Sequence, residues 1–552
     1  MLVQHKWLVL AAAVFGLFMA ILDASIVNIA IPTIERDLDT DIETVTWVLN
    51  SYNLVFAVLL IPAGRVADRF GRKRLFLIGI IIFSLCSLAA GLSEQIEMLI
   101  AWRAGQAVGA AIMVPVSLAI VTLAFPAHQR GLALGIWGAI SGVAGAVGPT
   151  LGGVLTEYVG WEWIFLVNVP VGLVAVLVGL VIIEESRDPE ARHRIDLPGI
   201  AMLSISLFSL TLALIRGQDV GWSSVFITGL LATSAVSGAL FFLVESVVSH
   251  PMIDLRMLRN RTFSAANVTI LLFGLGFFSA LFLVIQYLTV VEGYSALEAA
   301  FAITPFPACI MLTGPLAGRL SDRFGPRALV IAGVLIFGVA LFSFSRLTGG
   351  VPYPQIVWRL MLGGIGAGLI FAPLTSAAMG SVAGGRAGVG AGVFNTARQV
   401  GFTLGLAVLV AVFVGTLPSR VATAQEQAAT VVEQSDLPAP AKQGIIEGML
   451  SAPVEQAGQT ARSGTRQTFD LYDRLRQTAG PELADRFQPT LDELSQELQT
   501  VFARNIAGAF SRAFLVGAII LWMGAFPALL VTRAAAGGSG PVPEKKPPAA
   551  VG

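Results

Sequence analysis

Fourteen apolar stretches dominate the sequence, and each is about as long as the 20 residues that an α-helix needs to cross a bilayer. Such lengths argue against a transmembrane barrel, whose strands are about ten residues of alternating polarity. Only 13% of the residues are charged, whereas soluble domains contain about 25%, and the 58 glycines suit close helix packing in lipid. The sequence therefore predicts an all-α integral membrane protein. The predicted spans are 8–31, 44–63, 75–92, 98–123, 131–156, 162–183, 198–216, 223–244, 263–290, 297–317, 328–345, 354–378, 387–415 and 506–532.

The distribution of basic residues predicts the orientation of the chain. With the N-terminus inside, most arginines and lysines fall in short cytoplasmic segments, and the short outer loops contain only Arg36, Arg216 and Arg346. This asymmetry places both termini in the cytoplasm. The first apolar run continues through Ala30 without a small-residue cleavage site, so we expect an uncleaved first helix rather than a signal peptide. The lack of targeting extensions favours a multi-pass protein of the cytoplasmic membrane of a bacterium.

The first half of the sequence recurs in the second half. Three landmarks appear twice in the same order: GRVADRFGRKR at 64–74 and GRLSDRFGPR at 318–327, Arg103 and Arg359, and RGLALG at 130–135 and RAGVGAG at 386–392. A six-span unit is therefore used twice, with two spans inserted between the copies, as in many secondary transporters. The predicted regions are 1–183 (N-terminal six-helix bundle), 184–262 (inserted two-helix segment), 263–415 (first five helices of the C-terminal bundle), 416–505 (extracytoplasmic helical loop), 506–532 (last span) and 533–552 (disordered cytoplasmic tail).

The segment 416–505 is the one long polar region between predicted spans. It is rich in acidic residues, Leu491, Leu494 and Leu498 recur at helical spacing, and Gly480-Pro481 makes a break. We expect two or more amphipathic helices outside the membrane, which extend the last two spans as a projection. This segment is also the candidate contact for an extracytoplasmic partner.

Three charged residues lie deep inside predicted spans. Asp23 lies about fifteen residues into the first span, or roughly 22 Å into a core of about 30 Å, so its carboxylate cannot easily reach water. An aspartate at the bilayer centre costs about 2.5–3.5 kcal/mol and is rarely kept there without a function. Arg398 lies about eleven residues into its span, whereas Arg103 lies about five in and could extend to the interface.

These three residues are the candidates for proton coupling. Burial favours the protonated form of a carboxylate, whereas a nearby arginine favours the ionised form. Asp23 would therefore carry a proton if it approached Arg103 or Arg398 in one state and lost that partner in the other. The alternative is a fixed pair of Asp23 and an arginine that only holds helices together.

The repeated loop is a candidate conformational switch. Gly64 and Gly71 permit a tight turn and close helix approach. We expect Asp68 to cap the next helix or to pair with an arginine across the interface between the halves, a contact that breaks as the halves rock. The alternative, a simple positive-inside signal, does not explain the second copy. The predicted switch residues are Gly64, Asp68, Arg69, Gly71, Arg72, Asp322, Arg323 and Gly325.

These segments carry a family resemblance. The repeated loop resembles the signature cytoplasmic loop of the major facilitator superfamily, LIAWRAGQAVGAA at 99–111 is similar to its fourth-helix motif, and GAVGPTLGG at 145–153 to the fifth-helix motif of its antiporters. The resemblance covers nearly all of the chain outside the long outer loop and the tail. It implies a major facilitator fold, with two six-helix bundles plus two inserted helices.

Three more segments resemble one branch of that superfamily, the fourteen-span drug:proton antiporters of the multidrug efflux type. They are LDASIVNIAIP at 22–32, WEWIFLVNVPVG at 161–172 and NTARQVG at 395–401. The chain departs from the branch at Glu162, where an arginine is usual. It also lacks the mid-membrane acid that some members have in the later spans, so Asp23 is the only acid at such depth.

The glycine-rich segment 145–153 has a physical interpretation of its own. Pro149 removes a backbone donor and the glycines thin one face, so a pliable helix should pack very closely on a partner. The alternative is ordinary packing of small residues. The resemblance implies an antiport role, by sealing against ion leak. The residues of this motif are Gly145, Gly148, Pro149, Gly152 and Gly153.

Four polar or aromatic residues in spans are candidates for lining a substrate cavity: Asn53, Gln286, Phe394 and Asn395. Amides in spans more often form hydrogen bonds between helices, so this alternative stays open.

These observations favour a proton-coupled antiporter that exports lipophilic compounds by alternating access. The resemblance implies cationic or neutral drugs, and the alternatives are an exporter of lipids or of an endogenous metabolite, or an uptake carrier of the same superfamily. The expected partners are a small lipophilic substrate, protons and the lipid bilayer, and the chain is expected to act as a monomer. Zero net charge gives no attraction to nucleic acid. The four histidines show no ligand spacing, so no enzyme activity, metal or cofactor is expected.

Overall fold

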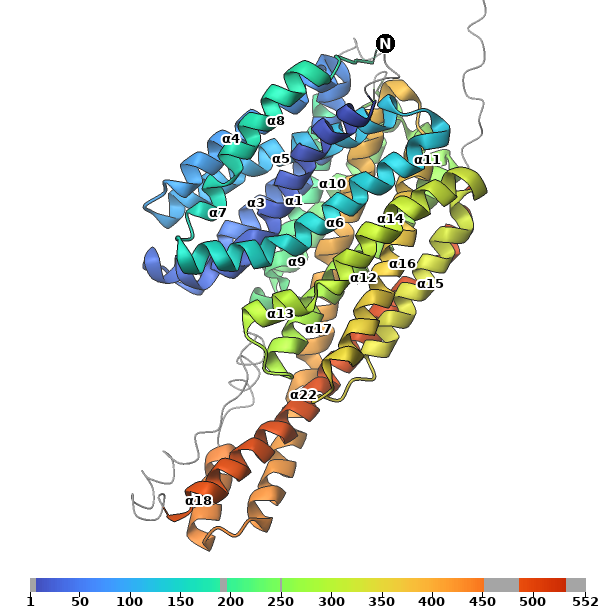
Figure 1. Ribbon diagram of the computed structural model, residues 1–552. Coiled ribbons are helices and arrows are strands. Elements are labelled where there is room, and N and C mark those ends of the chain that lie inside the picture. Colours follow the sequence, from blue (N-terminus) through green and yellow to red (C-terminus); the bar gives the residue numbers. More distant parts are fainter. Residues whose placement is uncertain (1–5, 189–195, 249–250, 451–485, 533–552) are drawn as a thin grey trace, which may run out of the picture.

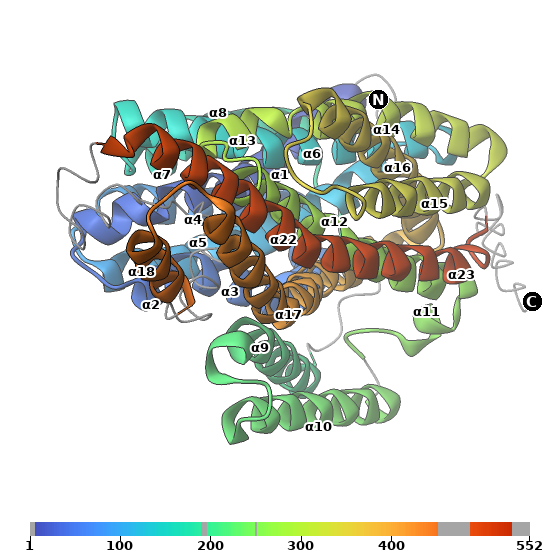
Figure 2. The same cartoon turned by 90° about the horizontal axis from the view of Figure 1, so that it is seen from below.

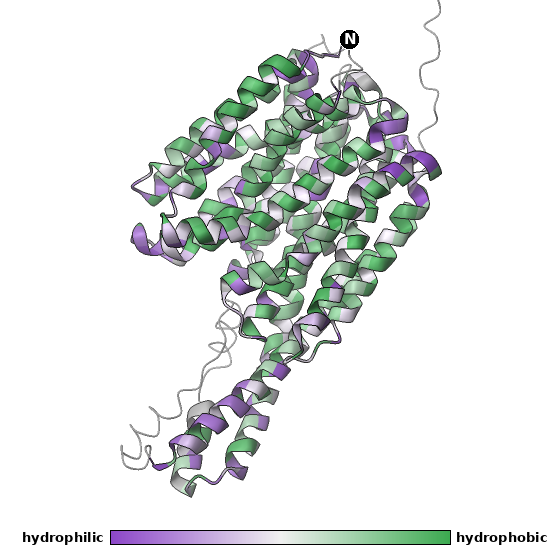
Figure 3. Cartoon of the chain, in the orientation of Figure 1, coloured by the Kyte–Doolittle hydropathy of each residue, from purple (hydrophilic) through white to green (hydrophobic). Residues whose placement is uncertain are grey.

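The computed structural model describes residues 6–188, 196–248, 251–450 and 486–532. Within these residues, fourteen helical segments are long and apolar enough to cross a membrane. This confirms the predicted all-helical fold and the number of spans. Hydrophobic residues cover most of the bundle, and hydrophilic residues gather at the helix ends and on a projection (Figure 3). This pattern is typical of a bundle that lies in lipid.

The first six spans form the N-terminal half. Its helices are α1 (Lys6–Asp37), α2 (Ile42–Val45), α3 (Trp47–Phe70), α4 (Arg72–Gly91), α5 (Ile96–Ala124), α6 (Ala127–Tyr158), α7 (Trp163–Leu166) and α8 (Asn168–Ile182). The turn between α3 and α4 is made by Gly71, whose φ of 116° favours glycine.

The inserted spans are α9 (Leu197–Val220) and α10 (Val225–Val247). Asp196 and Ser224 begin these helices, because each side chain accepts a hydrogen bond from a backbone N–H of the first turn. The pair lies outside the two halves, with α9 packed against α3 and α17 (Figure 2). Large apolar side chains of α10, among them Val225 and Val247, are exposed, as expected of a helix that faces lipid.

The last six spans form the C-terminal half. Its elements are α11 (Leu255–Arg259), α12 (Arg261–Val290), α13 (Ala296–Ala302), α14 (Pro305–Phe324), α15 (Pro326–Phe344), α16 (Tyr353–Gly380), the 3₁₀ turn η1 (Gly384–Arg386), α17 (Ala387–Gln434), α18 (Ala439–Leu450), α22 (Gln488–Met523) and α23 (Ala525–Ala528). The helices α17 and α22 are much longer than a bilayer requires, and they leave the bundle together as a projection (Figure 1).

The projection continues the last two spans without a break. Leu494 and Leu498 of α22 are buried, as are Ala424 and Ala428 of α17, so an apolar seam extends beyond the bundle. The expected borders at 415/416 and 505/506 therefore fall inside continuous helices, because a drop in hydropathy ends a membrane span without ending the helix. The expected break at Gly480-Pro481 and the expected disordered tail at 533–552 lie outside the described residues.

One end of the bundle carries both copies of the repeated loop, and we call it the loop face. The two ends of the described chain also lie there, since Lys6 donates to Gln129 (2.5 Å) at the start of α6 and Thr532 contacts Thr262 (2.7 Å) at the start of α12. The projection leaves the opposite end (Figure 1). An even number of spans requires the two ends to share a face.

The two halves approach each other very closely at the loop face. A Cβ added to Gly64 would lie 2.3 Å from the carbonyl oxygen of Gly388, and one added to Gly131 would lie 2.4 Å from that of Gly318. Contacts this short allow no side chain on either helix, which explains the glycines at these four positions.

Candidate functional site

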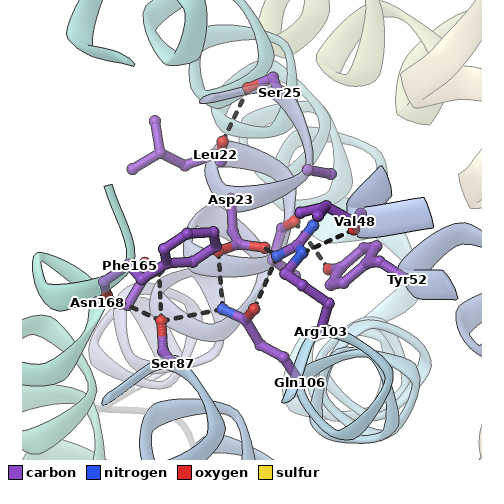
Figure 4. Close-up of polar contacts among 12 residues, drawn as sticks. Leu22, Asp23, Ser25, Val48, Tyr52, Ser87, Arg103, Gln106, Phe165 and Asn168 are labelled. Carbon is purple, nitrogen blue, oxygen red and sulfur yellow. Dashed lines mark hydrogen bonds and ion pairs between the residues drawn. The ribbon is translucent and has the colours of Figure 1, made fainter. Parts of the chain in front are cut away.

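The Asp23 carboxylate lies inside the N-terminal half, in the middle of α1. Its side chain is 0% exposed, and so are those of Arg103 and Gln106 on α5. The sequence left open whether Asp23 meets Arg103 or Arg398. In the structure it forms an ion pair with Arg103, whose Nη1 donates to Asp23 Oδ2 (Figure 4).

Two amides complete the shell around this carboxylate. Gln106 Nε2 and Asn168 Nδ2 both donate to Asp23 Oδ1, at 2.7 and 3.1 Å. The oxygen of Gln106 accepts a hydrogen bond from Arg103 Nη1 (2.7 Å), which fixes the orientation of the amide. An aspartate that accepts three donors and donates to none is in the environment that the ionised form prefers.

A second set of contacts connects this pair to neighbouring helices. Ser87 on α4 accepts from both amides, at 3.0 and 3.1 Å, and donates to the Phe165 carbonyl (2.8 Å). Arg103 Nε donates to the Val48 carbonyl (3.1 Å), and its guanidinium lies over the Tyr52 ring, 4.4 Å from the centroid. The group therefore joins α1, α3, α4, α5, α7 and α8 (Figure 4). A change in the charge of Asp23 affects contacts of nearly every helix in this half.

Sequence reasoning missed Ser87, Gln106 and Asn168. One signal was available for Gln106, which lies three residues after Arg103 and therefore shares its helix face. Asn168 lies in one of the family-like segments, but its position beside Asp23 depends on how α8 packs on α1. Arg103 Nη2 is buried without a hydrogen-bond partner, so one donor of the pair is free.

The glycine-rich motif on α6 packs against α1 directly beyond Asp23. A Cβ added to Gly152 would lie 2.6 Å from the Ile26 carbonyl oxygen, and one added to Gly148 would lie 1.9 Å from Ser25 Oγ. Gly145 and Gly153 have more room, with nearest atoms at 3.7 and 3.5 Å. Pro149 lies inside α6, which continues through it. The motif therefore places the α6 backbone against the helix that carries the buried acid.

Asp68 of the first loop joins the two halves. It is 0% exposed, and its oxygens accept the backbone N–H groups of Gly388 (2.9 Å) and Val389 (3.0 Å) in the first turn of α17. Arg72 donates to Asp68 from Nε (2.9 Å) and Nη2 (2.6 Å), and also from Nη2 to the Gly385 carbonyl (2.8 Å). The expected cap of the next helix is not made, because Glu185 accepts the N–H groups of Lys73 and Arg74 in the first turn of α4 instead. Asp68 caps a helix of the opposite half.

Asp322 of the second loop repeats this contact in the reverse direction. Its Oδ1 accepts the N–H of Gly131 (2.9 Å) and its Oδ2 that of Leu132 (3.1 Å), both on α6 of the N-terminal half. Each half thus places one carboxylate on backbone amides of the other. Of the remaining loop residues, Gly325 has a φ of 90°, and Arg69 and Arg323 lie over the rings of the phenylalanines that follow them.

The other predicted site residues are not gathered around Asp23. Arg398 is 4% exposed on α17, beside the rings of Phe371 and Phe402. The four candidates for lining a cavity come from three helices: Phe394 and Asn395 are buried on α17, Asn53 is half-buried on α3 and Gln286 is half-buried on α12. Their role in substrate binding stays a prediction.

The family model described as Major Facilitator Superfamily matches residues 13–406. Multidrug resistance protein Stp of Mycobacterium tuberculosis is 38% identical over 428 residues, which is 77% of this chain and 79% of that protein. The tetracenomycin C resistance and export protein of Streptomyces glaucescens is 35% identical over 407 residues, which is 73% of this chain and 75% of that protein.

A solved structure supports the same fold. The human organic anion transporter MFSD10 superposes with a TM-score of 0.53 at 15% sequence identity, over 94% of this chain and 99% of that one. At this identity, the likeness concerns the arrangement of helices and not the compounds that are carried.

Proposed function

The chain belongs to the major facilitator superfamily, as a fourteen-span multi-pass membrane transporter related to drug-resistance exporters and not an enzyme, and from this premise we propose that it is a proton-coupled antiporter for lipophilic compounds. The compounds would be neutral or cationic and would leave the cytoplasm by alternating access. The loop face would lie on the cytoplasmic side, with both termini, because arginines are concentrated there.

The single observation that carries this proposal is the ion pair of Asp23 and Arg103. A buried pair that loses one charge costs about 3–5 kcal/mol, because the other charge is left without compensation. A shift of a two-state equilibrium from 1:99 to 99:1 needs about 5.5 kcal/mol. Protonation of one aspartate therefore acts on an energy scale that can change which state of the transporter is populated.

We assign Asp23 the role of proton carrier. In the described state it accepts three donors, and these contacts favour the carboxylate form. A proton that arrives from the outer side would neutralise Asp23 and release the Arg103 Nη1 from it, while the Nε of Arg103 keeps its contact with the Val48 carbonyl. Release of this proton on the cytoplasmic side would restore the pair. A cationic compound would compete with the proton for the same negative charge.

The helix α6 is suited to transmit this change to the other half. Its motif end contacts α1 through Gly148 and Gly152, and its loop-face end contacts α14 through Gly131 and Gly135. A rearrangement around Asp23 that moves α1 would therefore act on a helix that also packs against the C-terminal half. The close packing at the motif would exclude water and limit proton leak.

The two loop carboxylates would act as a latch for the closed loop face. Asp68 and Asp322 hold backbone amides of the opposite half, and these contacts must break before the loop face can open. Their loss would shift the populations of the two states without removing a contact to the substrate. The projection built on 416–505 would stand outside the membrane, where it could guide substrate or contact a partner.

The proposal is tested by efflux from proteoliposomes. Ethidium serves as the lipophilic cationic probe, and an inward proton gradient is imposed on vesicles that contain the wild type or Asp23→Asn. Asparagine keeps the shape of the side chain but cannot ionise, so gradient-driven efflux should be lost while the protein still inserts into the membrane and binds neutral substrate. Gradient-driven efflux by Asp23→Asn at the wild-type rate would show that the proton is carried elsewhere.

A further inference from the structure

Arg398 is a buried cation that the proposed coupling mechanism does not use. Its side chain is 4% exposed, about eleven residues into α17, which corresponds to roughly 16 Å of helix. Among the described residues, no side chain or carbonyl forms a hydrogen bond or ion pair with it, and its Nε is enclosed without a partner. An unpaired arginine at this depth is costly and is typical of a site that receives an anion.

A second arginine shows that the fold can satisfy such a group when no ligand is needed. Arg359 on α16 is also buried, but its Nε donates to the Ser343 carbonyl (3.0 Å) and its Nη1 to the Gln355 carbonyl (2.5 Å). Arg398 has no such contacts. The difference indicates that the donors of Arg398 are kept for a partner that is not part of the described chain.

Two aromatic rings lie beside the Arg398 guanidinium. Its Cζ lies 5.6 Å from the centroid of Phe371 and 5.8 Å from that of Phe402. Phe402 in turn stacks on Phe278 (5.3 Å, interplanar angle 23°) and on Phe277 (6.0 Å, 19°). Rings in nearly parallel planes offer flat faces to a planar guest. A cation beside such faces suits an aromatic compound that carries an acidic group.

Phe371 lies between Arg398 and the N-terminal half. Its ring stacks on Trp137 of α6 (6.1 Å, 9°), and a Cβ added to Gly138 would lie 2.4 Å from Phe371 Cδ1. Trp137 is held in place, because its Nε1 donates to Ser117 Oγ (2.9 Å). When the halves separate at the loop face, Trp137 and Gly138 must leave Phe371. This movement would uncover Arg398 toward the side from which an exported compound enters.

Two further polar atoms near Arg398 in the chain lack partners. The Oδ1 of Asn395, one helical turn earlier, and the Oγ of Thr396 are both buried without a hydrogen bond. These atoms can receive hydroxyl or amide hydrogens of a guest.

We propose that Arg398 binds the acidic group of a planar aromatic substrate, a carboxylate or a phenolate, while the rings of Phe371 and Phe402 stack on its aromatic part. This inference rests on the proposed function for the direction of transport. It extends the substrate class beyond neutral and cationic compounds. It also assigns Arg398 to substrate recognition rather than to proton coupling.

The test uses probes that share one ring system and differ in charge. Binding of pyrene-1-carboxylate and pyrene-1-carboxamide to the purified full-length protein is measured by pyrene fluorescence, for the wild type, Arg398→Gln and Arg398→Lys. The wild type should bind the carboxylate about tenfold or more tighter than the amide, since a charge-assisted hydrogen bond contributes about 1.5–3 kcal/mol. Arg398→Gln should lose this preference but still bind the amide. Arg398→Lys should keep part of it, because lysine retains the charge without the planar fork.

Arg359→Gln is the matched control, and it should keep the wild-type preference. The inference is overturned if wild type binds the two probes equally or binds neither, or if the preference survives in Arg398→Gln. The proposed stacking on aromatic rings is overturned if dodecanoate, which has no ring, competes for the site as well as pyrene-1-carboxylate does. These measurements use no proton gradient. If the protein prefers the carboxylate probe through Arg398 but shows no gradient-driven efflux, only the proposed function is contradicted. If it shows gradient-driven efflux but no preference that depends on Arg398, only this inference is contradicted.

Discussion

The two halves of the molecule place an arginine at matching positions of the repeat and surround it very differently. Arg103 of the N-terminal half meets Asp23 and Gln106, all wholly buried. Arg359 of the C-terminal half binds backbone carbonyls and lines a small apolar cavity with Phe306 and Phe337. One copy of the fold thus pairs its arginine with a carboxylate, whereas the other copy pairs it with backbone carbonyls beside phenylalanine rings.

This difference suggests a division of labour between the halves. The aromatic cluster of the C-terminal half joins Phe277 to Phe306, Phe337 and Phe402, with ring centroids 5.5 to 6.2 Å apart. Among the residues of these rings nothing titrates near neutral pH, whereas the buried aspartate of the other half can accept a proton. We therefore expect proton coupling to depend on the N-terminal half and recognition of aromatic compounds to depend on the C-terminal half.

The largest effect is expected from removal of the two arginines one at a time. Arg103→Gln leaves the Asp23 carboxylate buried without its cation, which should cost about 3–5 kcal/mol of stability. Arg359→Gln removes the hydrogen bonds to the Ser343 and Gln355 carbonyls and leaves no buried charge without its partner, which should cost about 1–3 kcal/mol. Thermal unfolding in detergent measures both variants. The double variant Asp23→Asn/Arg103→Gln should recover much of the loss of Arg103→Gln. Equal losses for the two arginines would remove the distinction between the halves.

The next largest effect is expected from substitution of the two loop carboxylates, Asp68 and Asp322. Asp68 and Asp322 each bind two backbone amides of the opposite half, but Asp68 is wholly buried whereas Asp322 is half-buried. Asp68→Asn should slow ethidium turnover by about tenfold or more while binding changes little, because the contact stabilises one state only. Asp322→Asn should slow turnover less. A parallel loss of binding and turnover in Asp68→Asn would show that Asp68 supports the substrate site instead.

A smaller effect is expected at the α1–α6 contact, where the chain offers its own control. A Cβ at position 152 would lie 2.6 Å from a backbone oxygen, which cannot move away easily, whereas one at position 145 would have 3.7 Å of space. Gly152→Ala should therefore cost about 1–3 kcal/mol of stability and increase proton leak into vesicles, while Gly145→Ala should behave like the wild type. Leak that is equal in both variants would mean that close packing of α6 on α1 does not seal the path.

The smallest effect is expected for an ion pair at the surface, Asp254 with Arg386. Burial pushes the pKa of Asp254 upward, but the Arg256 N–H and the Arg386 charge outweigh it and hold the pKa below its ordinary value. A depressed pKa contributes stability above the unfolded-state pKa, and this contribution is lost as the pH falls through the folded-state pKa. Asp254→Asn should therefore cost less than about 1 kcal/mol at neutral pH, and the difference from wild type should vanish in acid. Unfolding measured across pH checks this, and a loss as large as that of Arg103→Gln would contradict it.

The membrane architecture was predictable because each span must be long and apolar, and because the repeated loop marks equivalent positions in the two halves. The depth of Asp23 and its need for an arginine also followed from the cost of a buried charge. The choice between Arg103 and Arg398 did not follow, since it depends on which of the helices α5 and α17 packs against α1. The projection was expected to extend the last two spans, but the unbroken course of α17 through Pro418 did not follow, because hydropathy reports where lipid ends and not where a helix ends.

The partners of the two loop carboxylates, Asp68 and Asp322, also depend on helix packing and could not be predicted from the sequence. A motif such as GRVADRFGRKR indicates a turn and a helix cap. Because the motif is local, it predicts that Asp68 caps the helix that follows it in the chain. The helix that Asp68 caps begins more than three hundred residues later, at Ala387, and only the packing of the two halves brings it there. Ser87 and Asn168 could not be assigned for the same reason, since a single serine or asparagine in an apolar helix has many possible partners.

The central claim, that Asp23 carries the coupled proton, is tested most directly by proton release on substrate binding. Purified protein in a weakly buffered, mildly acidic solution is mixed with ethidium, and a pH indicator follows the protons released by the wild type and by Asp23→Asn. We predict that the wild type releases protons when ethidium is added and that Asp23→Asn releases none. Equal proton release from Asp23→Asn and the wild type would contradict the account.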